Sequence, residues 1–298
     1  MLDFQRRCIP ELADQVAFVY RMRLDGTEGN DRHHTHLPNG TFEVILDLQG
    51  RAVHHGMGEA PRPQAFLGGM FNKLFHLRFS GPCDVVGAVL RPGAVHRFFD
   101  LPPDDLQCTL TPLQDLWTGT PMDAIRAILE GKEHSDPMEE LGRILQRVPR
   151  PGTYTPDPLM RAMADRTRRS GGSDRIETLA AKAHMSTRHF RRRFKAAIGM
   201  PAKEYGRLMR MNHFVQHWAH GDAGMSLVEQ AEQCGYYDGS HLRKDLSRYL
   251  GQEITDLDRT LRAGYQEFFL ASSPLSTSLA RAEVPQAASS GADTFRIG

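Results

Sequence analysis

The sequence has few cysteines and no long hydrophobic run, and each absence excludes a class of protein. Only 4 of its 298 residues are cysteine, scattered without a C-x-x-C pair: Cys8, Cys83, Cys108 and Cys234. This argues against a disulfide framework or a structural zinc site and favours a reducing compartment. No stretch approaches the roughly 18 apolar residues of a membrane span, and the first residues lack the order of a signal peptide. We expect a cytoplasmic protein with no membrane partner.

Charge is balanced overall but unevenly distributed along the chain. The net charge is only +1, and 40% hydrophobic with 24% charged residues is the composition of a globular protein. Residues 161–250 contain 17 Lys and Arg against 9 Asp and Glu, whereas the remainder contains 20 against 27. A basic segment beside an acidic remainder suggests that one part binds a polyanion, although a solvated basic surface has the same composition.

The first 150 residues are predicted to form a β-rich domain. Short apolar or alternating segments at 41–48, 73–79 and 84–90 end at Gly or Pro and indicate strands. Strands of this length and spacing favour a small barrel or sandwich. After Pro121 the apolar spacing becomes helical up to about residue 148. The polar stretch from Gly26 to Asn39 reads as a mobile loop.

Proline-rich breaks at residues 149–152 and 156–158 mark a domain boundary. We predict an all-helical domain over residues 157–269, so the fold class is α+β: a barrel-like domain followed by helices. Residues 271–298 are rich in Ala and Ser with little to bury, and we expect them to be disordered.

Within the helical part, one pattern occurs twice. A short helix with a small residue (Ala180, then Ala231) is followed by a turn and a second helix that ends at glycine (Gly199, then Gly251). The second helices carry apolar residues four apart: Phe190, Phe194 and Ile198, then Leu242, Leu246 and Leu250. Ser186 is the N-cap candidate in the first copy, and Asp238 or Ser240 in the second. The pattern predicts two helix-turn-helix units with C-cap glycines.

The segment from Asp174 to about Leu257 resembles the DNA-binding domain of AraC/XylS-type transcription regulators. In that family one long helix joins two such units and both second helices enter the major groove; here this helix is expected from Pro201 to about Ala219. The sequence departs from the family pattern in having His184 where the first turn usually has Gly. Leu242 and Leu246 replace aromatic anchors, and Asp245 places an acid beside the expected DNA-facing side.

With Phe190 and Phe194 inward, residues three to four positions apart bring the basic side chains to the outer face of the helix. Arginine suits base reading because its planar fork can donate twice to guanine. We predict the base-reading residues to be Arg188, Arg191, Arg192, Arg243 and Lys244. We predict contacts to the DNA backbone or the rim of the interface from Ser186, Arg193, Lys195, Arg210 and Ser240. The second helix could instead serve only to position the protein.

The N-terminal part is similar to the sensor domains that often precede such units. This resemblance implies effector binding or dimerisation, and also contact with RNA polymerase. No residue identifies the effector, and we expect no cofactor. Whether the chain activates or represses transcription stays open.

Two other functions remain as alternatives. His34, His36, Glu43 and His96 roughly resemble the ligands of a cupin metal site, in which histidine and carboxylate ligands suit a transition metal. The six-residue step from His36 to Glu43 is too long for that motif, so we expect no metal and no catalytic residue. A metal-dependent cupin-type enzyme with an accessory helical domain is thus one alternative. A nucleic-acid-binding protein without sequence preference is the other.

Overall fold

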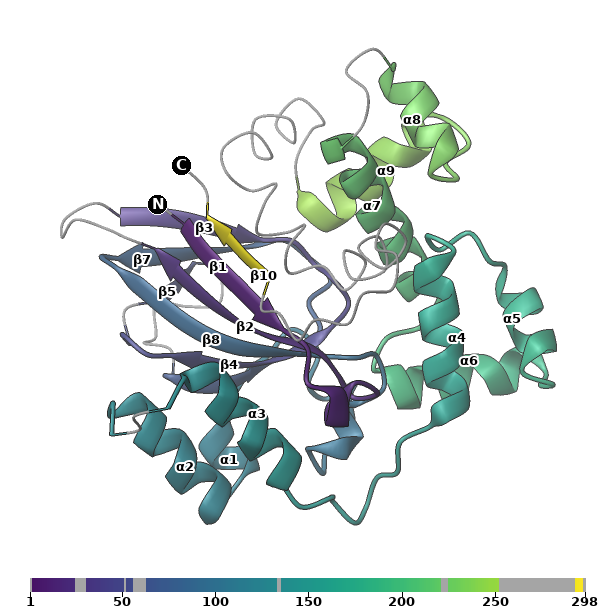
Figure 1. The fold of residues 1–298 in the computed structure, drawn as a ribbon. Helices are drawn as coiled ribbons and strands as arrows, with labels where there is room; N and C mark the ends of the chain where they lie inside the picture. The colour runs from purple at the N-terminus through teal and green to yellow at the C-terminus, as the bar shows by residue number, and fades with distance from the viewer. Residues whose placement is uncertain are drawn as a thin grey trace, which may run out of the picture.

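The structure, a computed structural model, describes residues 2–24, 31–50, 52–55, 63–132, 135–220, 225–251 and 293–296. Within these ranges no helix is both long and apolar enough to cross a membrane. A β-rich N-terminal part is followed by helices (Figure 1), as the predicted α+β fold class requires.

The N-terminal part contains two antiparallel sheets. The larger sheet has the strand order β10-β1-β2-β8-β4-β6-β9, and the smaller has the order β3-β7-β5. The strands are β1 (Leu2–Arg7), β2 (Val16–Leu24), β3 (Asp31–His36), β4 (Phe42–Asp47), β5 (Ala52–His55), β6 (Ala65–Gly68), β7 (Phe75–Ser80), β8 (Cys83–Leu90), β9 (Leu110–Pro112) and β10 (Asp293–Arg296).

The larger sheet does not close on itself, since among the described strands its edges are β10 and β9. The expectation of a barrel-like domain is corrected in this respect, because closure depends on long-range pairing that the spacing of strands does not determine. The segment Asp31–His36, expected to be a loop, is strand β3 paired with β7.

Side chains alternate between the two faces of the larger sheet. On β8, Val86, Ala88 and Leu90 join one apolar cluster, whereas Cys83, Val85 and Val89 join another on the opposite face. Helices α1 (Leu113–Leu116), α2 (Thr120–Leu129) and α3 (Pro137–Arg147) cover the first face (Figure 1). The short 3-10 turns η1 (Pro10–Leu12) and η2 (Val95–Arg97) link strands to the following segments.

The C-terminal part is helical. It contains α4 (Pro158–Arg169), α5 (Ile176–Lys182), α6 (Thr187–Ile198), α7 (Ala202–His220), α8 (Leu227–Gln233) and α9 (Gly239–Leu250). Helix α7 joins a pair of helices, α5 and α6, to a second pair, α8 and α9 (Figure 1). The apolar stripe expected to be buried along this helix is Tyr205, Leu208, Met209, Val215 and Trp218. The first four are almost fully buried, whereas Trp218 is only partly buried.

The segment expected to be disordered, 271–298, lies outside the described residues except for Asp293–Arg296. These four residues form β10 and pair with β1 in register Asp3–Arg296 to Arg6–Asp293. The edge of β1 offers backbone donors and acceptors to an extended chain, so these residues can pair there although they have little to bury.

Candidate nucleic-acid interface

The first helix pair is a compact unit whose turn contains an unusual backbone conformation. His184 has φ +52°, in the left-handed region that usually favours glycine. Ser186 caps α6 by accepting a hydrogen bond from the backbone N–H of His189 at 3.3 Å. Phe190, Phe194 and Ile198 are completely buried. The departure at His184 therefore leaves the helix-turn-helix geometry intact, at a backbone cost of roughly 1–2 kcal/mol.

The second helix pair repeats this geometry with different residues. Gly235, 51 positions after His184, has φ +80° at the corresponding turn. Of the two cap candidates Asp238 is the N-cap, since its carboxylate accepts from the N–H of His241 at 2.7 Å, and Ser240 lies inside α9. The C-cap residues Gly199 and Gly251 both adopt the left-handed conformation. The repeat found in the sequence is thus a structural repeat.

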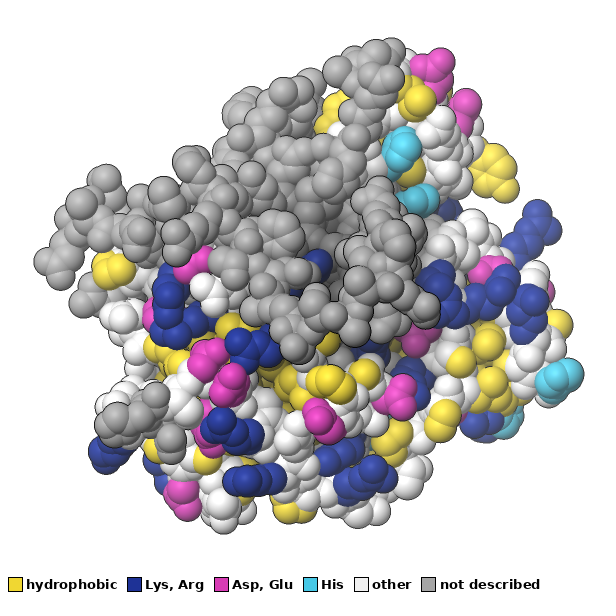
Figure 2. Space-filling view, in the orientation of Figure 1, with side chains coloured by type: hydrophobic (Ala, Val, Ile, Leu, Met, Phe, Trp, Pro, Cys, Tyr) yellow, Lys and Arg dark blue, Asp and Glu magenta, His cyan; other side chains and the backbone are white. Residues whose placement is uncertain are grey.

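The outer surface of α6 is basic. Arg188, Arg191, Arg192 and Lys195 are exposed, whereas Arg193 is half-buried. Arg193 donates through Nε and Nη2 to the carboxylate of Asp157, the N-cap of α4, at 2.5 and 3.1 Å. This pair holds α6 against α4. Figure 2 shows Lys and Arg side chains gathered over the region of α4 and α5.

The outer surface of α9 carries Ser240, Arg243 and Lys244, all exposed. Arg243 donates through Nε to the carbonyl of Gly239 at 3.2 Å, along its own helix. Leu242, Leu246 and Leu250 are buried, so leucines fill the place of the aromatic anchors.

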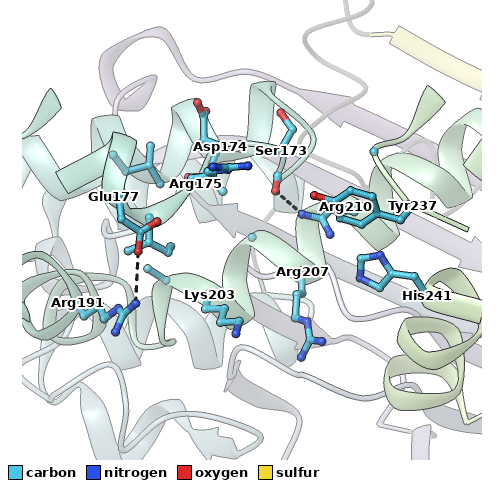
Figure 3. A pocket seen from close by; sticks show the side chains of 17 residues that line it. Ser173, Asp174, Arg175, Glu177, Arg191, Lys203, Arg207, Arg210, Tyr237 and His241 are labelled. Carbon is cyan, nitrogen blue, oxygen red and sulfur yellow. Dashed lines mark hydrogen bonds and ion pairs between the residues drawn. The ribbon is translucent and has the colours of Figure 1, made fainter. Parts of the chain in front are cut away.

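A cavity lies between the two units and is bordered by residues of both α6 and α9. It is lined by Arg191 of α6, by Lys203 and Arg207 of α7, and by Tyr237 and His241 at the start of α9 (Figure 3). Arg191 of α6 therefore lies beside the same opening as the first turn of α9.

Asp245 points inward, which corrects the expectation of an acid beside the DNA-facing side. It is 1% exposed, and one carboxylate oxygen lies 3.8 Å from Nε of Arg207 on α7. Asp245 follows Arg193 by 52 positions, so the two units use opposite charges at the same place. Arg193 bonds to an acid on the helix before its unit, and Asp245 lies near an arginine on the helix before its own. Asp245 lies three residues after Leu242 and four before Tyr249, both buried, so the helical spacing already places it on the inner face of α9.

Burial raises the pKa of Asp245, while Arg207, His241, Arg210 and Arg248 act to lower it. A raised pKa means that the folded chain holds this proton to higher pH than the unfolded chain. The contribution of Asp245 to stability is therefore largest below its unfolded pKa of about 4 and is lost as pH rises through the folded value.

The substitution Asp245→Asn should remove this pH dependence. We expect the free energy of unfolding to rise on the order of 1 kcal/mol at pH 7, because the other carboxylate oxygen is buried without a hydrogen bond from any described residue. The gain should vanish near pH 4. Urea unfolding between pH 4 and pH 8 measures it, with the exposed acid change Glu232→Gln as control. A gain that is equal at all pH values would show that the charge of Asp245 is not its cause.

Arg210, predicted to contact the DNA backbone or the rim, makes contacts inside the domain. Its Nη2 donates to the carbonyl of Gly172 at 3.0 Å, and its guanidinium lies 5.7 Å from the centre of the Tyr236 ring. It links the end of α4 to the turn of the second unit.

The metal-site candidates are only partly described. Both carboxylate oxygens of Glu43 accept hydrogen bonds, one from Tyr20 at 3.2 Å and one from Asn39 at 2.8 Å. His96 is buried and stacks on Tyr154 at 5.3 Å, and burial lowers its pKa. The side chains of His34 and His36 lie outside the described residues. Among the side chains that are described, no group of three His, Cys, Asp or Glu could hold a metal ion.

The N-terminal part packs against the first unit. Lys195 of α6 lies 3.1 Å from the carboxylate of Asp104, and a Cβ at Gly199 would lie 2.9 Å from Pro103. In the second unit, the N–H of Leu74 donates to the carbonyl of Tyr249 on α9 at 2.7 Å. The apolar core is continuous from the larger sheet to both units.

Comparison with known families agrees with this geometry. Residues 179–260 match a family model described as a helix-turn-helix domain, and residues 7–111 match a domain of unknown function (DUF6597). The C-terminal part is an AraC-type DNA-binding domain. The chain that carries this AraC-type domain is thus a DNA-binding transcription regulator. No curated protein matches the sequence significantly.

Solved structures with a similar fold include several of ToxT from Vibrio cholerae. One ToxT structure has a TM-score of 0.43 at 10% identity, covering 80% of this chain and 96% of ToxT. ToxT bound to (E)-4-(8-methylnaphthalen-1-yl)but-3-enoic acid has a TM-score of 0.43 at 10% identity, covering 85% and 97%. ToxT bound to an unsaturated fatty acid has a TM-score of 0.40 at 10% identity, covering 79% and 92%.

Sequence reasoning about the AraC-type domain missed the residues between its two units. Arg175, Lys203, Tyr237 and His241 line the cavity, but none lies on the outer face of a second helix. Tyr237 is 85% exposed, which is unusual for a large aromatic side chain. Its place directly before the N-cap Asp238 is the signal in the sequence that could have drawn attention to it.

Proposed function

We propose that this regulator reads an operator with α6 and α9 in successive segments of the major groove, about 34 Å apart. The observation that carries the proposal is the exposure of Arg188, Arg191 and Arg192 on one helix whose opposite face is fully buried. If the basic face of α6 were merely solvated, a second helix-turn-helix unit bordering the same cavity would not be required. Sequence preference then comes from base contacts, and phosphate contacts supply orientation.

The roles of the side chains follow from their surroundings. We assign base reading to Arg188, Arg191 and Arg192 of α6, and to Arg243 and Lys244 of α9. Each good bidentate pair contributes about 1–3 kcal/mol of discrimination.

Backbone contacts fall to residues at the edges of the two recognition helices. Ser186 and Ser240 lie in the first turns of the two helices, where a phosphate is within reach. Lys195 serves the backbone once Asp104 releases it. Arg193 and Arg210 are already bonded inside the domain, so we assign them to the edge of the interface.

The N-terminal part is proposed to control DNA binding, through an effector or through dimerisation. This is supported by its direct contacts with α6, where the pair Lys195–Asp104 joins a backbone-contacting residue to the sensor part. The same proposal includes contact with RNA polymerase, a cytoplasmic location and no catalytic role. Each of these is expected of a transcription regulator.

The substitution Arg192→Ala tests base reading. Duplexes are first selected from a random pool by the full-length chain, and binding is then measured by fluorescence anisotropy. At the base pair read by Arg192, we expect discrimination to fall about 10-fold to 100-fold, equivalent to about 1–3 kcal/mol. The control is Arg126→Ala on α2, an exposed arginine of the N-terminal part. If Arg192→Ala keeps the wild-type sequence preference, Arg192 is not a base reader.

A further inference from the structure

The cavity between the two helix-turn-helix units has a volume of about 430 Å³. Helix α7 forms its floor, and the start of α5 with Arg191 of α6 forms one wall. The turn before α9 forms the opposite wall, with Tyr237 and His241 (Figure 3). It therefore lies between the two helices that are proposed to enter the DNA.

The lining of this cavity is strongly basic. Five cationic side chains line it against two acids: Arg175, Arg191, Lys203, Arg207 and Arg210 against Asp174 and Glu177. Both acids are paired, Glu177 with Arg191 at 3.7 Å and Asp174 with Arg166 at 2.8 Å. Arg175 and Lys203 are exposed, and neither forms an ion pair with any residue that the structure describes. Arg207 lies 3.8 Å from Asp245, so Arg175 and Lys203 supply the positive charge of the cavity that no described acid balances.

Two further features fit a ligand that is both anionic and partly apolar. The Nε of Arg210 and the Nδ1 of His241 are buried and have no hydrogen-bond partner among the described residues. Tyr237 is 85% exposed and stacks on His241 at 6.0 Å, so an aromatic face is presented to solvent beside the cations. A deoxyribose-phosphate unit combines a charged group with an apolar sugar face.

We propose that this cavity binds the sugar–phosphate backbone of DNA where it crosses between the two major-groove segments. Two helices in successive major-groove segments leave one minor groove facing the protein between them. The two DNA strands that border this minor groove cross the protein surface between the two recognition helices. In this chain the cavity occupies that place, with Arg175 and Lys203 as the phosphate contacts and Tyr237 against the sugar. The inference rests on the proposed function and adds a site that neither recognition helix contains.

Salt dependence of binding to a random-sequence duplex tests the site directly. Each lost phosphate contact should reduce the slope of log affinity against log salt by about 0.9. Lys203→Gln and Arg175→Gln should therefore each weaken binding about fivefold to tenfold at roughly 0.1 M salt. The matched control is Lys132→Gln, whose side chain is 72% exposed on the N-terminal part. Variants with the slope of this control would overturn the proposal.

A duplex with single neutral methylphosphonate linkages locates the contact. One substitution near the centre of a selected site should weaken wild-type binding about fivefold to tenfold. The same linkage should cost Lys203→Gln little, since its contact is already lost. Equal losses in both proteins would place Lys203 away from that phosphate and overturn the proposal.

Two comparisons distinguish a DNA-backbone site from a free-anion site and from a base-reading site. Inorganic phosphate at matched ionic strength should not change the melting temperature; a shift that Lys203→Gln abolishes would assign the cavity to a free anion instead. Lys203→Gln should weaken binding to selected and random duplexes by the same factor, because phosphates are common to both.

The proposed operator reading and the cavity proposal can fail separately. If the wild type shows no preference for any selected duplex, the proposed operator reading fails, while the change in salt slope still tests whether the cavity binds the DNA backbone.

Discussion

Replacing Gly172 with alanine should lower the free energy of unfolding by about 2–5 kcal/mol and abolish operator binding. Gly172 has φ +71°, where a side chain costs about 1–2 kcal/mol. A Cβ there would also lie 1.9 Å from the carbonyl oxygen of Gly206 on α7. Backbone atoms cannot rotate away, so α7 has to shift, and forced repacking costs about 1–3 kcal/mol more. Because α7 carries the second unit, this shift also changes the separation of α6 and α9.

Substitutions at two other glycines distinguish the cost of the close contact with Gly206 from the cost of the positive φ. Gly251 has φ +62°, and no atom of the described residues lies within 4 Å of a Cβ placed there, so Gly251→Ala should show the conformational cost alone. At Gly206 a Cβ would lie 3.8 Å from the nearest atoms, an ordinary contact, so Gly206→Ala should be mild. Urea unfolding followed by circular dichroism, with anisotropy on a selected duplex, measures all three. Equal losses at Gly172 and Gly251 would show that the contact with Gly206 contributes nothing.

The helix-turn-helix units could be predicted from the sequence because their signals are local. Ser186, Asp238 and the two C-cap glycines mark helix ends within a few residues, and the apolar spacing identifies the buried face. The repeat then supplied a second, independent copy of the same pattern. Exposure of the predicted base readers followed directly from burial of the residues between them.

The N-terminal part was harder to predict because its strands depend on distant partners. The polar segment Asp31–His36 carries no apolar alternation, yet pairing with β7 makes it a strand. The edge strand β10 comes from the far end of the chain and pairs with β1. Local spacing was enough to predict the strand at Phe42–Asp47. Strand order and closure depend on the whole sheet, so local spacing could not predict that the larger sheet stays open.

The candidate site was incomplete for the same reason. Helical periodicity places Asp245 on the buried face with Leu242 and Tyr249, and the expectation of an outward acid did not apply this spacing; only the packing shows that Arg207 of α7 lies beside it. The cavity lining comes from several separate helices and turns, of which the sequence pattern identified only α6 and α9 as DNA-facing. Lys203 and Arg175 lie at helix starts, outside any recognition helix, and only the arrangement of the two units brings them together.

The aromatic contact between α6 and α7 should be the most costly side-chain contact to remove from the first unit. The ring of Phe194 is completely buried, 5.6 Å from the ring of Phe190 and 5.7 Å from that of Tyr205 on α7. Phe194→Ala should lower the free energy of unfolding by about 3–5 kcal/mol, from lost apolar burial and the cavity left behind. Urea unfolding of the full-length chain measures the loss.

A graded series shows whether this contact also positions α6 for DNA binding. Phe194→Leu keeps most of the volume, so we expect it to cost less than half as much as alanine. Where both variants are still folded, operator affinity should fall with the loss of aromatic contact, because the packing of its buried face, including Phe194 on Tyr205 of α7, orients α6. If Phe194→Ala costs less than about 1 kcal/mol, or if it leaves operator affinity at the wild-type value, then the arginines of α6 are held in place by Arg193 and Asp157 rather than by the aromatic core.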